Sequence, residues 1–188
     1  TTRPRPCTRP FSALRESPLP TFLVALGELL VIFVPHRVRA DAVLMSGDWG
    51  KLACDAWNAE PVLTDQLAAS GWAANDKGRG QKVLQIYRSD CGDQPTTELR
   101  ISNQNNKAQC VYGGAVETVL DLDVDYLMNA KTKHWKEMGA GEYGPMWAMM
   151  SFKLKFKGPE MEAMNNMEPF EKFLLLAGVV PSSSATCP

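Results

Sequence analysis

The sequence GAGEYGPMWAMMSFKLKFKGPEMEAMNNM occupies residues 139–167, and its pattern decides the fold. After a glycine-rich turn and a short helical run, apolar and charged residues alternate strictly. The two sides of the alternation are Phe152, Leu154 and Phe156, and Lys153, Lys155 and Lys157. A period of two predicts a strand with one buried face and one solvent face. Gly158-Pro159 predicts the turn that ends this strand.

The same segment is rich in methionine. Seven of the nine methionines in the chain lie between Met138 and Met167, and Met161, Met164 and Met167 follow helical spacing. Methionine is flexible and polarisable, so it fills irregular space. One interpretation is an ordinary core in which methionine fills gaps. The other is the wall of an apolar pocket, and the pattern leaves both open.

The run Lys153-Leu154-Lys155-Phe156-Lys157-Gly158, followed by Ala163-Met164, resembles the signature of the sterol carrier protein 2 (SCP2-like, sterol-binding) domain family. The family pattern is roughly G-K-L-K-aliphatic-K-G-D, with an A-M pair after it. This chain differs at Phe152, where the family usually has glycine, and at Pro159, where it often has Asp or Asn. The resemblance covers residues 46–180 and implies five strands, with an apolar tunnel between sheet and helices.

Helix and strand signals give the order of the other elements. Ser46 precedes apolar residues at helical spacing and is a predicted N-cap. Pro61 opens a second predicted helix that ends at Ala69. Four predicted strands follow at residues 82–88, 97–102, 108–113 and 115–120. Two further helices are predicted, one capped by Asp121 or Asp123 and running through VDYLMNAKTKHW, and one over residues 169–178.

This order predicts an α+β fold in which helices cover a five-stranded, mostly antiparallel sheet. The loops between the predicted strands are short, which favours antiparallel neighbours. The alternating segment supplies the fifth strand. Between sheet and helices, the apolar tunnel is expected from the resemblance alone.

The predicted domain spans residues 40–180. Residues 1–39 are a predicted leader, rich in arginine and proline at its start. Its apolar run, Phe22–Val34, is shorter than the about 20 residues that a membrane-spanning helix needs. We interpret the leader as an extension foreign to the domain, as a signal peptide ending near Val38-Arg39-Ala40, or as a membrane-surface helix. Residues 181–188 show no packing pattern and are predicted to fray.

Composition excludes some functions. The formal net charge is −1, and no basic stripe is interleaved with aromatic residues, so we expect no nucleic-acid binding. The spacing of the cysteines predicts neither a zinc site nor a disulfide scaffold. We therefore expect free thiols and a cytoplasmic location, or a secreted or membrane-associated one if residues 22–34 form a signal. The cysteines are Cys7, Cys54, Cys91, Cys110 and Cys187.

Two catalytic interpretations are weaker than their structural alternatives. Cys91, between carboxylates in a glycine turn, is a candidate nucleophile, but neighbouring aspartates raise a thiol pKa and His134 is the only histidine of the predicted domain. A hairpin turn of Asp, Gly and Ser explains the same residues. The glycines of residues 139–144 lack the lysine and Ser/Thr of a phosphate-binding loop, so a flexible mouth or hinge is favoured.

We therefore expect a carrier without chemistry, cofactor or metal, which binds a sterol or fatty acyl lipid, contacts membranes transiently and is a monomer. An SCP2-like accessory or interaction module without a ligand is the alternative. Tyr126, Lys131 and Lys133 are candidate head-group contacts, or simply solvated side chains. The predicted wall of the tunnel is Met128, Trp135, Met146, Trp147, Met150, Phe152, Leu154, Phe156, Met164, Phe170 and Leu174. Periodicity places these residues on apolar faces, and only the resemblance implies a cavity.

Overall fold

The computed structural model describes residues 41–188. The predicted leader, with its apolar run Phe22–Val34, lies outside the described residues. Within them, no helix combines the length and the hydropathy needed to cross a membrane.

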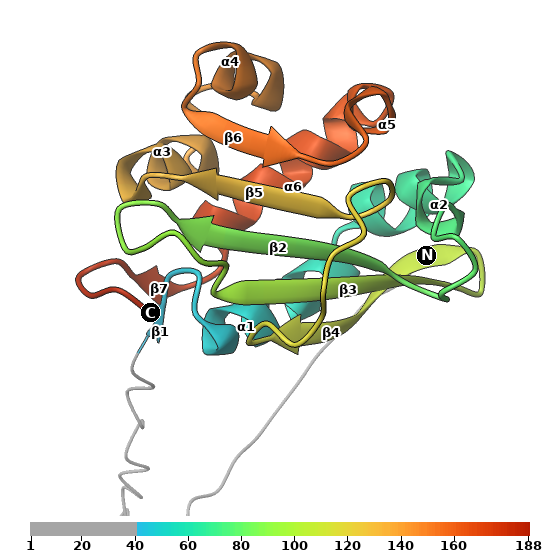
Figure 1. The fold of residues 1–188 in the computed structure, drawn as a ribbon, viewed down its shortest axis with the longest axis horizontal. Helices are drawn as coiled ribbons and strands as arrows, with labels where there is room; N and C mark the ends of the chain where they lie inside the picture. The colour runs from blue at the N-terminus through green and yellow to red at the C-terminus, as the bar shows by residue number, and fades with distance from the viewer. Residues whose placement is uncertain (1–40) are drawn as a thin grey trace, which may run out of the picture. The chain divides into compact units, whose positions relative to one another are not determined.

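Five strands form one mixed sheet in the order β4-β3-β2-β5-β6 (Figure 1). Neighbouring strands are antiparallel except for β2 and β5, which are parallel. The predicted five-stranded, mostly antiparallel α+β fold is therefore confirmed. The strands are β2 (Lys82–Arg88), β3 (Thr97–Gln104), β4 (Lys107–Gly114), β5 (Tyr126–Ala130) and β6 (Leu154–Lys157). A separate two-stranded parallel sheet joins β1 (Ala42–Val43) to β7 (Ser182–Ser183).

The longer helices lie behind the sheet in the view of Figure 1. They are α1 (Gly47–Asn58), α3 (Thr132–Gly139) and α6 (Met167–Val179). Shorter helical turns connect the elements or flank β6. They are η1 (Val62–Gln66, a π-helix), α2 (Leu67–Ala69), η2 (Trp72–Ala74, a 3₁₀ helix), α4 (Pro145–Met150) and α5 (Glu160–Met164). The predicted helices after Ser46, after Pro61 and at residues 169–178 are confirmed.

Helix α1 packs directly onto the edge strand β4. The Ser46 Oγ caps the helix by accepting a hydrogen bond from the backbone N–H of Trp49, at 3.2 Å. Glycines let the two backbones touch, because a Cβ at Gly113 would lie 2.1 Å from the carbonyl oxygen of Gly50. This close approach presses the apolar face of α1 against the sheet.

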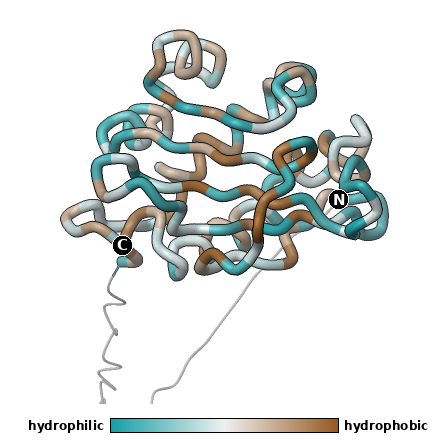
Figure 2. The backbone as a smooth tube through the Cα atoms, in the orientation of Figure 1, coloured by the Kyte–Doolittle hydropathy of each residue, from teal (hydrophilic) through white to brown (hydrophobic). Residues whose placement is uncertain are grey.

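Two predictions between residues 115 and 131 are wrong. Residues 115–120 are not a strand but part of a segment that crosses the sheet on the face opposite the long helices (Figure 1). The predicted helix through residues 124–135 is instead strand β5 followed by α3. A short apolar run fits both the helical period of 3.6 residues and the strand period of two. Tertiary pairing therefore decides whether it forms a helix or a strand. The hydrophobic stretch on the crossing segment is visible in Figure 2.

The crossing segment is held by a buried carboxylate. Glu98, fully buried on β3, accepts hydrogen bonds from the Thr118 backbone N–H at 2.9 Å and from its hydroxyl at 2.7 Å. Burial alone would raise the pKa of Glu98, but these hydrogen bonds and Arg100 bring that pKa below its usual value. At the other end, fully buried Asp125 binds the Arg79 guanidinium at 2.6 and 2.8 Å.

The predicted alternation around β6 holds for four of its residues and fails for Phe152. Leu154 is buried, Phe156 is half-buried, and Lys155 and Lys157 are exposed. Phe152, predicted to face the core, is 85% exposed and has φ +57°. Its backbone N–H closes a turn onto the carbonyl of Met149, at 3.0 Å, and this turn directs the ring away from the sheet.

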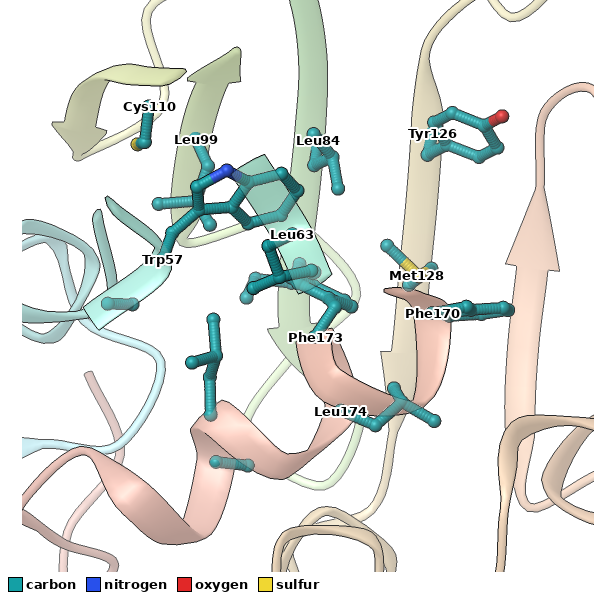
Figure 3. Close-up of a cluster of buried hydrophobic side chains, with 14 of the residues drawn as sticks. Trp57, Leu63, Leu84, Leu99, Cys110, Tyr126, Met128, Phe170, Phe173 and Leu174 are labelled. Atoms are coloured by element: carbon teal, nitrogen blue, oxygen red, sulfur yellow. The ribbon is translucent and has the colours of Figure 1, made fainter. Parts of the chain in front are cut away.

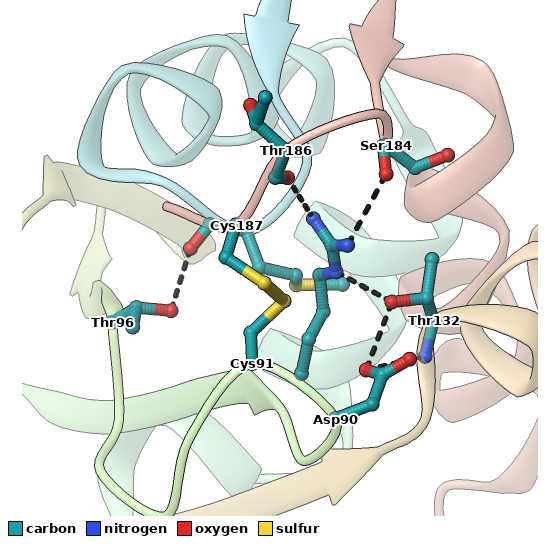
Figure 4. The surroundings of a disulfide bond; sticks show 9 residues. Asp90, Cys91, Thr96, Thr132, Ser184, Thr186 and Cys187 are labelled. Carbon is teal, nitrogen blue, oxygen red and sulfur yellow. Dashed lines mark hydrogen bonds between the residues drawn. A yellow bond between two sulfur atoms is a disulfide. The ribbon is translucent and has the colours of Figure 1, made fainter.

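The tail, residues 181–188, does not fray as predicted. Strand β7 pairs with β1, and the Arg88 guanidinium donates to the carbonyl oxygens of Thr186, at 2.8 Å, and Ser184, at 3.3 Å (Figure 4). Cys187 then forms a disulfide with Cys91 in the turn after β2. Arg88 is a buried strand residue, so the tail is fixed to the body of the domain.

The prediction of free thiols is also wrong for the described cysteines. Besides the bond between Cys91 and Cys187, a second disulfide joins Cys54 on α1 to Cys110 on β4. Spacing along the chain gave no sign of these pairs, because their partners are 56 and 96 residues apart and only the fold brings them together. Cys7 lies outside the described residues.

Replacing Cys54 and Cys110 together with alanine will lower the free energy of unfolding by about 2–4 kcal/mol, because the unfolded chain is no longer closed into a loop. Urea unfolding of the variant beside the parent protein measures this difference. Cys7→Ala is the control, since Cys7 belongs to neither disulfide, and it should leave the midpoint unchanged. Equal midpoints for parent and double variant would contradict the predicted stabilisation.

Candidate functional site

Six aromatic side chains form a closed ring between the sheet and the helices. Each contacts the next, with ring centroids 5.3–6.4 Å apart. In order around the ring they are Trp57, Trp72, Tyr126, Phe156, Phe170 and Phe173. Such pairs are worth about 0.5–1.5 kcal/mol each beyond the area they bury. The ring therefore joins α1, η2, β5, β6 and α6 into one unit.

This ring surrounds an apolar space of about 40 Å³, which we name the aromatic cavity. Figure 3 shows several of its lining side chains between the strands and α6. A cavity of this size has room for one or two water-sized groups rather than for a whole lipid. Its lining consists of the six ring residues with Leu67, Leu84, Met128, Ala163, Asn166 and Pro169.

Local sequence patterns explain how the ring is placed. Trp49, Ala53 and Trp57 are buried at a spacing of four on α1, and Phe170 and Phe173 recur at helical spacing on α6. The polar atoms of the two ring tryptophans are satisfied at the edge of the cavity. The Trp57 Nε1 donates to the Ala108 carbonyl at 2.8 Å, and the Trp72 Nε1 donates to the Tyr126 hydroxyl at 3.1 Å. Their indole faces are thereby left for the apolar interior.

A buried ion pair lies beside the ring. The Lys82 Nζ, whose side chain is fully buried, lies 2.5 Å from the Glu162 carboxylate, and the Tyr126 hydroxyl donates to the same oxygen. The Nζ also lies 4.7 Å from the centroid of the Trp72 ring. Asn75 donates to the second carboxylate oxygen at 2.8 Å. Glu162 thus ties helix α5 to the sheet.

These contacts set the protonation states around the cavity. Burial lowers the pKa of Lys82, and the Glu162 carboxylate opposes that shift. Burial and the Glu162 carboxylate both raise the pKa of Tyr126 far above its usual value, so the hydroxyl stays protonated and acts as a donor. The charge of Lys82 is met by a single carboxylate, and the edge of the cavity carries no unpaired ion.

A second apolar space, which we name the methionine groove, opens to solvent next to β6. Its volume is about 450 Å³. Phe156 and Ala163 line both the groove and the aromatic cavity, so these two side chains separate the spaces. The lining of the groove is Met146, Met149, Met150, Phe152, Leu154, Lys155, Phe156, Glu160, Ala163 and Met164.

The predicted wall residues divide into three groups. Met128, Phe156 and Phe170 line the aromatic cavity. Six line the methionine groove, namely Met146, Met150, Phe152, Leu154, Phe156 and Met164. Trp135, Trp147 and Leu174 line neither space. Trp135 is buried and donates its Nε1 to the Tyr87 carbonyl at 3.0 Å, Leu174 is buried in the core, and Trp147 is 58% exposed.

The predicted wall omitted four of the six residues of the aromatic ring. Trp57 and Phe173 already belonged to the apolar faces of predicted helices, but no local signal shows that these two helices meet over the sheet. Tyr126 was considered only as a head-group contact, together with Lys131 and Lys133. Strand β5 separates it from both lysines by five residues or more, about 16 Å. Trp72 lies in a short 3₁₀ turn that has no periodic signal.

The catalytic interpretation of Cys91 is contradicted, because its sulfur is bonded to Cys187.

Gly139 allows α3 to pack closely against α6, because a Cβ there would lie 2.5 Å from the backbone nitrogen of Gly178. Among residues 41–188, no group of His, Cys, Asp or Glu side chains is arranged to hold a metal ion.

Comparisons with known proteins agree on one family. The model of the SCP-2 sterol transfer family matches residues 65–171, more than half of the chain. A crystal structure of sterol carrier protein 2 has a TM-score of 0.50 and 19% identity, and the alignment covers 73% of this chain and 98% of that chain. At this identity the likeness establishes the fold.

Two other solved structures are less similar. A conserved hypothetical protein from Thermus thermophilus has a TM-score of 0.47 and 18% identity, over 78% of this chain and 97% of that chain. The apo form of sterol carrier protein 2 from Yarrowia lipolytica has a TM-score of 0.38 and 18% identity, over 66% of this chain and 88% of that chain. No curated protein matches the sequence at a significant level.

Replacing Glu162 with glutamine will lower the free energy of unfolding by about 3–5 kcal/mol at neutral pH, because Lys82 is left buried without a counter-ion. Adding Lys82→Met should recover most of the loss. The exposed pair of Lys77 with Asp121 is the control, and Lys77→Ala should cost less than about 1 kcal/mol. Urea unfolding measures all four proteins.

The loss in the Glu162→Gln variant should also depend on pH. Without the carboxylate, the pKa of Lys82 in the folded state lies further below its unfolded value of about 10.4. The unfolded state then binds more protons, so the stability of the variant rises as pH rises toward that value. A loss that stays constant between neutral and alkaline pH would contradict a charged, buried Lys82.

Proposed function

The chain belongs to the SCP-2 sterol transfer family, and from this premise we propose that it binds and carries a lipid of the sterol or fatty acyl kind, without chemistry of its own. The observation that carries the proposal is that the methionine groove and the smaller aromatic cavity share Phe156 and Ala163. A lipid seated in the groove needs only these two side chains to shift for its apolar end to reach the cavity.

The volumes support this division of roles. Ligand pockets usually hold about 300–1,000 Å³, and the methionine groove falls within that range while the aromatic cavity does not. Unbranched methionine side chains adapt to ligands of different shape. We therefore assign the body of the lipid to the groove and its tip to the cavity.

Binding of this kind needs no strong polar contact. At about 25 cal/mol per Å² of apolar surface, burying about 300 Å² of lipid contributes about 7 kcal/mol. This gain offsets the freedom that the lipid loses on binding. Because Lys82 is already paired with Glu162, the site favours a lipid whose buried end is apolar or uncharged. The Tyr126 hydroxyl already donates its proton to Glu162, so it offers no free donor to the lipid.

One observation supports the alternative, an accessory or interaction module without a ligand. The aromatic ring is closed, and the space inside it is about 40 Å³. If Phe156 and Ala163 do not move, the groove remains a shallow surface feature and the core is complete. The two functions therefore differ in whether a lipid binds the isolated protein saturably.

The compartment proposed from the sequence also changes. Disulfides persist mainly in oxidising compartments, and four described cysteines are paired in two such bonds. We therefore favour the secreted or membrane-associated alternative over a cytoplasmic location. Alkylation of the protein as it is recovered from its source, followed by mass spectrometry, should leave these four cysteines unlabelled. Labelling of all four would show free thiols and would favour a reducing compartment instead.

Displacement of a fluorescent sterol or fatty acyl probe from the full chain should be saturable and close to one-to-one. The test variant is Met164→Trp, because Met164 lines the groove. We expect about a tenfold or greater loss of affinity, since the indole fills space that the lipid needs. Met161→Trp is the matched control, because Met161 lies on the same helix, is 69% exposed and lines neither space.

Both variants should unfold at the parent's urea concentration, because each new indole projects toward solvent or into open space. If the parent binds neither probe, the carrier function is wrong and the interaction module stands. Equal loss in both variants would show that the probe binds somewhere other than the groove.

A further inference from the structure

Exposed apolar side chains gather at one edge of the domain. Among residues 41–188, ten large hydrophobic side chains are exposed, and six of them lie between residues 146 and 164. We name these six the apolar edge patch. They are Met146, Trp147, Met150, Phe152, Met161 and Met164, and their exposed fractions range from 42% to 85%.

The patch has a defined place in the fold. Helices α4 and α5 stand at the two ends of β6, which is the last strand of the sheet (Figures 1 and 2). Its members come from α4, from the turn before β6 and from α5. Four of them, Met146, Met150, Phe152 and Met164, also line the methionine groove. The groove therefore opens within the patch.

The exposure of Phe152 is not explained by folding. A bulky residue with φ +57° is held in a sparsely populated backbone conformation. The ring gains almost no burial in return, because it is 85% exposed. A smaller or more permissive residue would stabilise this turn better. The benefit of a phenylalanine here must come from contact with something other than residues 41–188.

Positive charge accompanies the patch. Lys155 and Lys157 project from β6 to solvent, and the side chain of neither makes an ion pair or hydrogen bond with another residue between 41 and 188. Glu160 is the acidic residue of the groove lining. Aromatic and long apolar side chains beside unpaired lysines match a membrane interface, where apolar groups enter the acyl boundary and lysines meet anionic head groups.

We propose that the apolar edge patch docks onto the surface of an anionic phospholipid membrane, with the methionine groove facing the bilayer. The patch then serves as the place where lipid passes between membrane and protein. The role in lipid passage rests on the proposed function. The docking itself does not, because it depends on the six apolar side chains and the two lysines.

A second copy of the chain fits this edge less well. Pairing of two copies along β6 would bring the lysines of both strands together, and like charges at a sheet edge oppose such pairing. Helices α4 and α5 also flank β6 at its two ends rather than forming one flat apolar surface. A membrane adapts to this uneven outline, whereas a second rigid copy does not.

The helix α4 side of the patch is fixed to the body of the domain. Glu137 on α3 accepts a hydrogen bond from the Tyr143 hydroxyl at 2.7 Å, lies 3.0 Å from the His134 Nδ1 and pairs with Lys153 at 3.4 Å. These contacts lower the pKa of Glu137 to about 2, and the contact with His134 has the largest effect. This pKa lies below the usual glutamate value of about 4.3. The stabilisation from the Glu137 contacts is therefore fully present above about pH 4.3 and is lost only as pH falls toward 2.

Tryptophan fluorescence offers a direct readout. Trp147 is 58% exposed, while the other four tryptophans, Trp49, Trp57, Trp72 and Trp135, are at most 6% exposed. The full chain is mixed with vesicles of phosphatidylcholine alone or with added phosphatidylserine, each containing brominated phosphatidylcholine. We expect quenching and co-sedimentation with the phosphatidylserine vesicles. In Trp147→Phe, quenching should be lost while co-sedimentation remains.

Two variants test the two halves of the patch. Phe152→Gly removes the exposed ring and relieves the backbone, so the protein should fold at least as stably, yet partition into vesicles about tenfold or more weakly. Val119→Ser is its control, because Val119 is 92% exposed on the crossing segment. Replacing Lys155 and Lys157 with glutamine should weaken binding to phosphatidylserine vesicles about thirtyfold. The matched control replaces Lys51 on α1 and Lys107 on β4 with glutamine. It changes the net charge of the protein by the same amount, but away from the patch.

Each outcome decides the proposal. A parent that sediments with neither kind of vesicle overturns it, as does an equal loss in the test and control variants. If vesicle binding fails but a lipid probe still binds the groove, docking is wrong while the proposed function stands. Self-association that is lost in Phe152→Gly, without vesicle binding, would assign the patch to a second copy instead.

Discussion

The parallel pairing of β2 with β5 is the constraint on which the rest of the structure depends. These strands are not neighbours in sequence, so the chain must cross the whole sheet between β4 and β5. Two fully buried carboxylates hold this crossing in place, Glu98 near its start and Asp125 at its end. Only with β5 paired to β2 do Tyr126 and Met128 face the helices beside Leu84, and only then does the aromatic ring close.

The same arrangement explains why the candidate site has two parts. Ring contacts that stabilise the core also reduce the inner space to about 40 Å³, so the core itself cannot hold a whole lipid. Larger space is left at the sheet edge, where α4 and α5 flank β6 and expose their methionines. Phe156 and Ala163 line both spaces and therefore lie at the boundary between them.

The two disulfides lie away from this boundary. The disulfide between Cys54 and Cys110 fixes α1 to β4 at the opposite edge of the sheet, and the one between Cys91 and Cys187 fixes the tail. Near the boundary itself, α5 is held mainly by the Glu162 carboxylate and by the small buried side chain of Ala163. Covalent links therefore lie far from the groove, and noncovalent contacts hold the elements around it.

The sequence alone determined the fold class, most of the helices and strands, and the family, because residues 153–164 carry a period-two strand, its turn and the following helix in one short run. Local patterns also placed Met128, Phe156 and Phe170 on apolar faces. Whether residues 126–130 form a strand, which cysteines pair, and which apolar faces meet around a cavity were decided only by the tertiary structure. These features depend on contacts between residues far apart in the chain, such as Trp57 with Phe173 or Cys91 with Cys187, and periodicity reports only on neighbours within a few residues.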